Sequence, residues 1–516
     1  MKKLLVLLLV LMVAATAFAT GNQSTSSGAR TTIQIPVYDR AFQGWSVTDN
    51  FWTRWMQKEF GDPNNIDVQY VAIGRQTEVQ DFSQMMAARR APHIIFHYDM
   101  PYAVQYYTQG FFQQLNYSEI QQYAPSFWAR TRGMIERYGT INNERVFFFA
   151  ERPEADNYTA VVRKDWVERA GYKVEDLTNL ETFNQMLIRW RDLGLGVFGA
   201  NLNRNNYTMS YPFRDWPVND RERALYSELN VADLTWAPMK EWLRNMNWMY
   251  NNNVMDREFY LRDDEAKTRA EFVAGRTGNF GFYMTGNTDL FSALKANNPT
   301  AEVAVLPMGW NVPQGKAPQG RGYWPFGMIQ GINQFATNDQ RIAVWKFIEW
   351  MNGDANLFAL QNGIAGQNYT MGANGIPNRV ADYAGESAQS PNTNKDYWCL
   401  VVEAARYPNP DTFWAVNRSL WAAPGYENLA DDLIRYYRAG GQYRTPDPLW
   451  TVPIAAMDEY RNDLNELFQQ LYVSIVRAPT AQFETVYATA CQTYLRAGYQ
   501  QILDEKQRVI NAGNFR

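Results

Sequence analysis

Strand-like and helix-like periodicities alternate near the N-terminus of the chain, and this order restricts the folds that the chain can adopt. Apolar side chains recur at every second position in residues 31–38 and 66–70, as they do in strands. Residues 51–60 and 77–86 instead place apolar side chains three or four positions apart, as one face of a helix requires. A short, mostly apolar run follows at residues 93–96. The order strand–helix–strand–helix–strand predicts an open α/β sheet with largely parallel strands.

Two loops follow the carboxyl ends of these predicted strands, which is where ligands bind in open α/β sheets. The loop 39–49 contains Trp45 among polar groups, and the loop 97–100 places Tyr98 beside Asp99. An aromatic ring can stack on the C–H face of a sugar, and a carboxylate can accept hydrogen bonds from its hydroxyls. We therefore predict that Trp45, Tyr98 and Asp99 bind ligand. Packing within the loop is the alternative for Trp45, and a helix N-cap is the alternative for Asp99.

The high aromatic content also favours a sugar ligand. Phe, Trp and Tyr make up 15% of the chain, with 18 Trp and 31 Tyr, and Tyr and Trp combine an apolar face with one polar group. Four further aromatic residues are predicted to bind ligand: Tyr283, Trp310, Trp324 and Trp414. Ordinary packing, in a core or on the surface, is the alternative. Arg163 is a candidate partner for an acidic sugar, although a local salt bridge is favoured for it.

The first residues of the chain predict export from the cytoplasm. Residues 1–19 combine two lysines, an apolar run at 4–13 and an Ala-x-Ala site that ends at Ala19, which together are typical of a cleavable signal peptide. The apolar run is shorter than the roughly 20 residues that span a bilayer, so an uncleaved anchor is disfavoured. No cysteine lies near the cleavage site, so a lipid cannot be attached to an N-terminal cysteine. Residues 20–30 are small and polar and predict a disordered leader. We expect a mature protein in the periplasm or another extracytoplasmic compartment.

Several function classes are disfavoured. A net charge of −4 argues against nucleic acid as a partner, and no G-x-S-x-G, P-loop or H-E-x-x-H motif is present. His93 and His97 are the two histidines, and on a strand their separation spans ~13 Å at ~3.3 Å per residue, too far for one ion. We therefore predict no catalytic residue, no metal and no cofactor. An oxidising compartment permits a disulfide between Cys399 and Cys491, but buried free thiols remain the alternative.

Short segments along the chain, taken in order, resemble the extracellular solute-binding proteins of family 1. Residues 111–125 resemble their "G-x-F-x-x-L-x … I-x-x-Y-A-P" run, and residues 163–183 are similar to "R-K-D-W-L … P-x-T-x-x-E-F". Residues 271–278 resemble the "F-x-x-G-K-x-G" turn. Residues 306–307 and 363–369 are similar to "P-x-G-P-x-G" and "G-x-x-G-x-x-Y". Within that family the chain most resembles the LipO-like and alginate-binding-like branch of maltose-binding-protein relatives.

The resemblance implies a periplasmic-binding-protein-like α/β fold, in which two open α/β lobes are joined by hinge strands and close over a ligand. Carried over to this chain, lobe one takes residues 31–155 and 302–362, and lobe two takes 157–301 and 363–516. The implied protein is a monomer and not an enzyme. It captures a sugar or oligosaccharide and delivers it to the membrane permease of an ABC importer. A binding protein for peptides or another solute, and a periplasmic polysaccharide-degrading enzyme, remain the alternatives.

One departure from the branch concerns calcium. The alginate-binding relatives have an acidic, glycine-rich calcium loop after the helix that follows the "R-K-D-W-L" segment. The corresponding residues 187–203 contain a single acidic residue, Asp192. Since calcium needs several oxygen ligands at fixed offsets, we predict that no calcium binds there.

Overall fold

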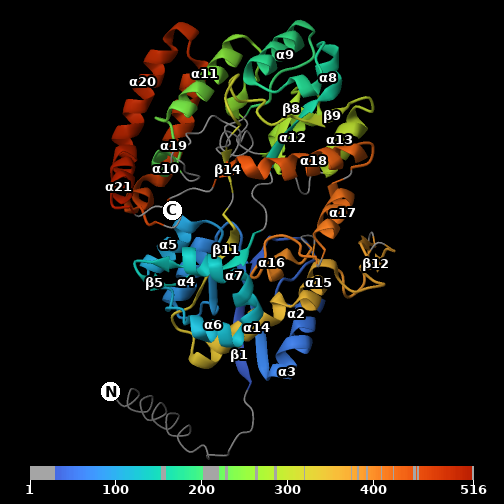
Figure 1. Cartoon of the computed structure of the whole chain (residues 1–516), viewed down its shortest axis with the longest axis vertical. Helices are drawn as coiled ribbons and strands as arrows, with labels where there is room; N and C mark the ends of the chain where they lie inside the picture. The colour runs from blue at the N-terminus through green and yellow to red at the C-terminus, as the bar shows by residue number, and fades with distance from the viewer. Residues whose placement is uncertain are drawn as a thin grey trace, which may run out of the picture.

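The helices and strands of the computed structural model form two groups, stacked along the longest axis of the molecule (Figure 1). The predicted signal peptide and most of the leader lie outside the described residues. The structure describes residues 30–152, 158–200, 220–226, 231–261, 265–283, 288–318, 320–322, 324–373, 375–380, 383–390, 393–407, 409–421, 423–445, 449 and 452–513.

We call the lower group in Figure 1 lobe one. It is built from two separate stretches of the chain. Its elements are β1 (Thr31–Asp39), α2 (Phe51–Met56) continued by a π-helical turn (Gln57–Gly61), α3 (Asp62–Asn64), β2 (Ile66–Gly74), α4 (Glu78–Ala87), β3 (Ile94–His97), α5 (Met100–Thr108), α6 (Tyr117–Tyr123), α7 (Pro125–Tyr138), β4 (Thr140–Ile141), β5 (Glu144–Arg145), β6 (Phe148–Glu151), β11 (Phe326–Ile332), α14 (Asn338–Asn352), α15 (Asp354–Asn362), β12 (Tyr369–Met371), β13 (Pro377–Arg379) and α16 (Lys395–Trp398).

The upper group, lobe two, is also built from two stretches, and its C-terminal part is helical (Figure 1). Its elements are β7 (Tyr158–Arg163), α8 (Lys164–Arg169), α9 (Leu180–Asp192), α10 (Asp220–Tyr226), α11 (Ala237–Asn251), α12 (Glu265–Val273), β8 (Asn279–Tyr283), α13 (Thr288–Asn297), β9 (Val303–Val305), α17 (Pro410–Trp421), α18 (Glu427–Gly440), α19 (Ala455–Arg477), α20 (Phe483–Tyr494) and α21 (Gln500–Asn511). The chain passes between the two groups more than once. A short parallel pair, β10 (Gly320–Arg321) with β14 (Arg444–Thr445), lies where the chain passes from lobe two back to lobe one.

The predicted alternation of strands and helices in residues 31–97 is confirmed, but the expected parallel direction holds only for β1 and β2, and β3 belongs to a separate sheet. β1 and β2 pair in parallel from Thr31↔Ile66 to Asp39↔Gly74. The strand order β3–β11–β6 is antiparallel, and so is β8–β7–β9 in lobe two. β11 reverses the direction because it re-enters lobe one from a distant part of the chain, which local periodicity does not reveal.

Buried side chains divide into cores that match the two lobes. The lobe-one core draws on residues between 33 and 150, between 324 and 360, and between 397 and 402. The lobe-two cores draw on residues between 160 and 312 and between 421 and 502. Residues 306–312 therefore pack in lobe two and residues 397–402 in lobe one, beyond the predicted boundaries at 302 and 363. We propose that the second and third crossings lie after residues 312 and 402.

The third crossing is tied to lobe one by backbone hydrogen bonds. Glu151, at the end of β6, donates from its backbone nitrogen to the carbonyl of Val401 at 3.1 Å and accepts from the nitrogen of Glu403 at 2.7 Å. The side-chain Nε2 of Gln330, on β11, also donates to the carbonyl of Leu400 at 2.8 Å. The segment around residue 401 thus completes a sheet whose other strands lie much earlier in the chain.

The two cysteines do not form a disulfide. Cys399 is buried in the lobe-one core and Cys491 is partly buried on α20 of lobe two, and both are free thiols. The free-thiol alternative is therefore confirmed, although only Cys399 is fully buried.

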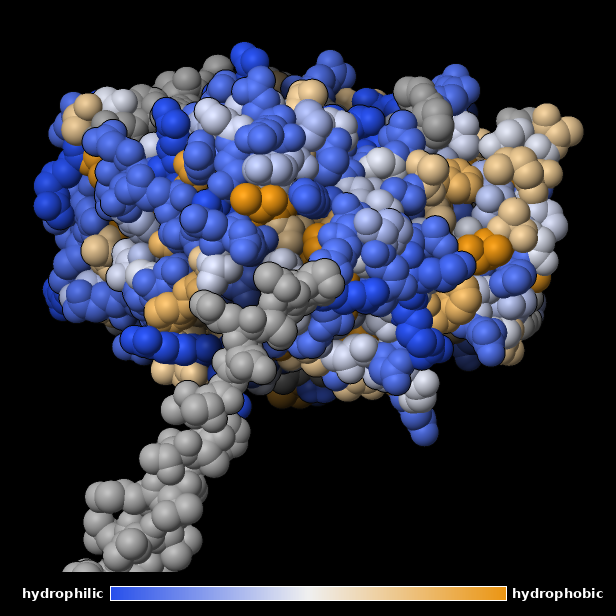
Figure 2. Space-filling model, turned by 90° about the horizontal axis from the view of Figure 1, so that it is seen from below, coloured by the Kyte–Doolittle hydropathy of each residue, from blue (hydrophilic) through white to orange (hydrophobic). Residues whose placement is uncertain are grey.

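The face of the molecule seen from below is mostly hydrophilic, with apolar side chains in small separate groups among the hydrophilic ones (Figure 2). Among the described residues, none of the helices combines the length and apolarity that a membrane crossing needs.

Candidate ligand-binding site

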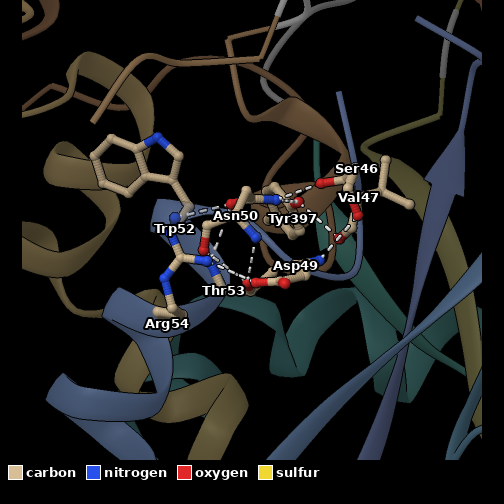
Figure 3. A network of polar contacts seen from close by, with 8 residues as sticks. All are labelled: Ser46, Val47, Asp49, Asn50, Trp52, Thr53, Arg54 and Tyr397. Atoms are coloured by element: carbon tan, nitrogen blue, oxygen red, sulfur yellow. Dashed lines mark hydrogen bonds and ion pairs between the residues drawn. The ribbon is translucent and has the colours of Figure 1, made fainter. Parts of the chain in front are cut away.

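The loop that carries Trp45 is anchored by a hydrogen-bond network at the start of α2 (Figure 3). The side-chain oxygen of Asn50 accepts from the backbone nitrogen of Trp52 at 2.8 Å, so Asn50 caps the helix. Its amide nitrogen donates to the carbonyl of Ser46 and to the hydroxyl of Tyr397, both at 2.7 Å. That hydroxyl in turn donates to the carbonyl of Val47 at 2.8 Å. A residue of α16 thus holds the loop in place.

We predict that Asn50→Ala lowers the free energy of unfolding by about 2 kcal/mol, because it removes the helix cap, the bond to Ser46 in the loop and the bond to Tyr397 on α16. The matched variant is Asn116→Ala, which removes the cap of α6 alone, and for which we expect a loss of about 1 kcal/mol. Urea unfolding measures both. Equal losses would contradict the anchoring role of Asn50.

Trp45 is half-buried and faces a narrow hollow at the end of β1. An ion pair closes one side of the hollow: the Nε and Nη2 of Arg40 donate to the two carboxylate oxygens of Asp396 at 2.9 and 2.8 Å. The paired guanidinium and carboxylate satisfy each other, so they form a rigid wall. The residues around the hollow are Val37, Tyr38, Asp39, Arg40, Phe42, Trp45, Val47, Ser390, Asp396 and Tyr397.

A stack of rings continues this edge toward β3. The rings of Tyr38 and Tyr98 are nearly parallel, with centroids 6.1 Å apart. The Arg75 guanidinium lies 5.0 Å from the Tyr38 ring centroid and 5.5 Å from that of Tyr98. Burial raises the pKa of both phenols well above the usual value, so both remain neutral hydroxyls. The structure thus brings the predicted Tyr98 to the same edge as Trp45.

A histidine orients the start of α5. The Nδ1 of His97 accepts from the backbone nitrogen of Asp99 at 2.8 Å, so we assign the proton to Nε2, which lies 2.7 Å from the carboxylate of Glu78. Burial raises the pKa of Glu78, but the bond to His97 and the charge of Arg75 outweigh it, and the pKa lies below its usual value. Asp99 occupies the N-cap position of α5, yet its side chain makes no capping bond and is partly exposed.

One contact from lobe two reaches this edge. The guanidinium of Arg461, on α19, lies 4.4 Å from the ring centroid of Tyr102, on α5. Tyr102 is one helical turn beyond Asp99, to whose carbonyl its backbone nitrogen donates at 3.1 Å. The aromatic edge of lobe one therefore meets lobe two here.

Comparison with protein families decides the family of this two-lobed chain. Residues 55–369 match the model of the bacterial extracellular solute-binding proteins. The chain belongs to this family. The resemblance read from the short motifs is thereby confirmed, and the family consists of binding proteins that serve ABC importers. A comparison with curated proteins gives no match.

Solved structures share the fold of this solute-binding protein over nearly its whole length. The alginate-binding protein AlgQ2 aligns with a TM-score of 0.62 at 16% identity, covering 93% of this chain and 98% of its own. An extracellular solute-binding protein from Bifidobacterium longum subsp. infantis aligns with a TM-score of 0.62 at 13% identity, covering 94% and 99%. The S. pneumoniae substrate-binding protein FusA, solved in complex with kestose, aligns with a TM-score of 0.61 at 10% identity. The alignment covers 94% of this chain and 99% of FusA. The predicted periplasmic-binding-protein-like fold is confirmed.

Two of the predicted ligand-binding tryptophans of the solute-binding protein are core residues. Trp310 is 1% exposed and packs on Phe183, with ring centroids 4.6 Å apart. Trp324 is 4% exposed and packs edge-on against Tyr138 at 4.9 Å. Their Gly- and Pro-rich surroundings are typical of surface loops, but both indoles turn inward. The geometry favours the packing alternative for both.

The other two predicted residues, Tyr283 and Trp414, belong to elements of lobe two, β8 and α17. Trp414 is half-buried on α17, where its ring meets Tyr437 edge-on at 5.1 Å and lies under the Arg438 guanidinium at 4.9 Å. Tyr283 is the last residue of β8, paired with Tyr158. Binding by either remains a prediction.

Several residues of the edge escaped the sequence analysis, namely Tyr38, Arg40, Arg75 and Arg461. Arg461 left a signal, because it interrupts the apolar stripe of α19 between Met457 and Leu464. For metals, no three His, Cys, Asp or Glu side chains gather as a site would need within the described part of the chain. The expected absence of calcium at 187–203 stays a prediction, since the description of that segment ends at residue 200.

Proposed function

We propose that this protein binds a sugar or oligosaccharide between its lobes, in an extracytoplasmic compartment, and delivers it to the permease of an ABC importer. The observation that carries the proposal is the grouping of Trp45, Tyr98 and Asp99 at one edge of lobe one, beside the Tyr102–Arg461 contact with lobe two. Indole and phenol faces suit the C–H surface of a sugar, and the carboxylate suits its hydroxyls. Each of these groups stands at the end of β1 or β3, as ligand-binding groups do in α/β sheets.

The same geometry favours binding over hydrolysis. A glycosidase needs two carboxyl groups about 5–9.5 Å apart on either side of the scissile bond. The other carboxylate in the Asp99 network, Glu78, is 5% exposed and bonded to His97. In the hollow at the end of β1, both oxygens of Asp396 accept hydrogen bonds from Arg40, so this carboxylate is engaged as well. This supports a binding protein that leaves its ligand unchanged.

Thermal-shift measurements against a panel of oligosaccharides test the proposal. A ligand at a hundredfold excess over its Kd stabilises the folded state by about 2.7 kcal/mol, so a clear rise in Tm is expected with at least one sugar. The same mixtures, analysed for products after incubation, are expected to contain intact sugar only.

Two results would redirect the proposal. Steady release of shortened or unsaturated sugars would show a polysaccharide-degrading enzyme. Stabilisation by peptides but by no sugar would show a binding protein of the other solute class.

A further inference from the structure

Arg461 is a buried arginine whose guanidinium forms no ion pair with the described residues. Its side chain belongs to the buried stripe of α19, and the residue is 6% exposed. Two of its nitrogens, Nε and Nη1, are shielded from solvent and make no hydrogen bond with any residue that the structure describes. Its guanidinium instead lies against the ring of Tyr102, which belongs to the other lobe.

Arg163 shows how the chain treats another buried arginine. It is 1% exposed, and its Nε and Nη2 donate to both carboxylate oxygens of Asp165 at 2.8 and 2.6 Å. This is the local salt bridge that the sequence favoured. Burying a charge is costly unless a partner compensates it. Arg461 has no such hydrogen-bonded partner among the described residues. The charge of Asp458, one turn earlier on α19, interacts with that of Arg461, but no ion pair joins the two side chains.

The position of Arg461 beside α5 indicates which molecule could provide an anionic partner for its guanidinium. The guanidinium lies against Tyr102 of α5, one turn from Asp99, which is a proposed ligand-binding residue. A ligand that Asp99 binds is therefore close to this part of α19. A guanidinium presents a planar fork of donors, which matches the paired oxygens of a carboxylate or a sulfate ester.

Building on the proposed function, we propose that Arg461 pairs with an anionic group of the ligand, so that the sugar bound by this protein is acidic. Closing the lobes over the ligand withdraws this pair from water, which strengthens it relative to an exposed pair. The Tyr102 ring holds the guanidinium in the junction until the anion arrives. Hydrogen bonds to charged groups contribute about 1.5–3 kcal/mol, which corresponds to about a tenfold to hundredfold gain in affinity.

Isothermal titration calorimetry tests this with three oligosaccharides of equal length: a uronate, a sulfated sugar and a neutral sugar. We expect the wild-type protein to bind one acidic sugar at least about tenfold more tightly than the neutral one. Tighter binding of the uronate would identify a carboxylate as the anionic group, and tighter binding of the sulfated sugar would identify a sulfate ester. Arg461→Gln should lose about tenfold to a hundredfold in affinity for that acidic sugar and should bind the neutral sugar as the wild type does.

Arg477 provides a matched control on the same helix. It is exposed, and its guanidinium lies 4.9 Å from the ring centroid of Tyr260, within lobe two. Arg477→Gln should leave the affinities for all three sugars unchanged. A second variant, Arg461→Met, separates charge from folding: because it removes a buried charge that lacks an ion pair, its ligand-free Tm should equal or exceed that of the wild type.

The outcomes are distinct. Equal affinity of wild type and Arg461→Gln for the acidic sugar, or equal binding of acidic and neutral sugars by the wild type, would overturn this inference and leave the proposed function standing. Failure of the wild type to bind any sugar would overturn both. A large fall in the ligand-free Tm of Arg461→Met would show that the guanidinium is already compensated, which also contradicts the inference.

Discussion

Replacing Trp310 with alanine is expected to lower the free energy of unfolding by about 3–5 kcal/mol, the usual cost of truncating a buried tryptophan. The indole packs on Phe183 and Phe198 in the lobe-two core, so its removal leaves a closed cavity that the neighbouring rings cannot fill. Urea unfolding of the ligand-free protein, followed by far-UV circular dichroism, measures the loss.

The control for this experiment is Trp414→Ala. Trp414 is half-buried and packs at the margin of a core, so we expect less than half the loss seen for Trp310→Ala. A stable Trp310→Ala variant that fails to bind ligand would show instead that this ring contacts the sugar, and that the packed arrangement is not its working one.

The second large effect is expected on binding. Trp45→Ala should weaken the affinity for the sugar nearly a hundredfold, because about 100 Å² of apolar contact is worth about 2.5 kcal/mol. The Tm of the ligand-free protein should change little, since the side chain is half-buried and Asn50 and Tyr397 hold the loop. Calorimetric titration together with a thermal melt of the ligand-free variant measures both quantities.

Trp55 offers a matched comparison on α2. It is also half-buried, but it packs on Trp52 and Trp350 within lobe one. Trp55→Ala should therefore lower the Tm and leave the affinity unchanged. The opposite pattern, with Trp45→Ala unstable and still binding, would assign Trp45 to structural packing.

The parts of the site that sequence predicted are those that follow from local order. The alternation of strands and helices located the ends of β1 and β3, and a general property of α/β sheets then predicted that the loops with Trp45, Tyr98 and Asp99 bind ligand. This step needed no knowledge of contacts between distant residues.

The parts that sequence missed depend on packing between distant segments. The antiparallel place of β11 and the inward turn of Trp310 and Trp324 are set by partners far away in the chain. A loop has no periodicity that separates its inner from its outer side, so an indole in a Gly- and Pro-rich stretch gives no sign of its direction. Arg461 was recognisable only as a charge within an apolar stripe, and its partner on α5 lies in the other lobe.

The late closure of the lobe-one sheet has a consequence for the order of folding. β6 ends at Glu151, but its neighbour β11 begins at Phe326, and the segment that bonds to Glu151 lies around residue 401. Contacts between such distant segments carry a large loop-closure entropy and form slowly. A chain emerging from the ribosome therefore cannot complete this lobe until most of its length has been synthesised. This delay leaves the polypeptide unfolded for longer, and an unfolded chain is what a translocation channel accepts when a protein crosses a membrane before it folds.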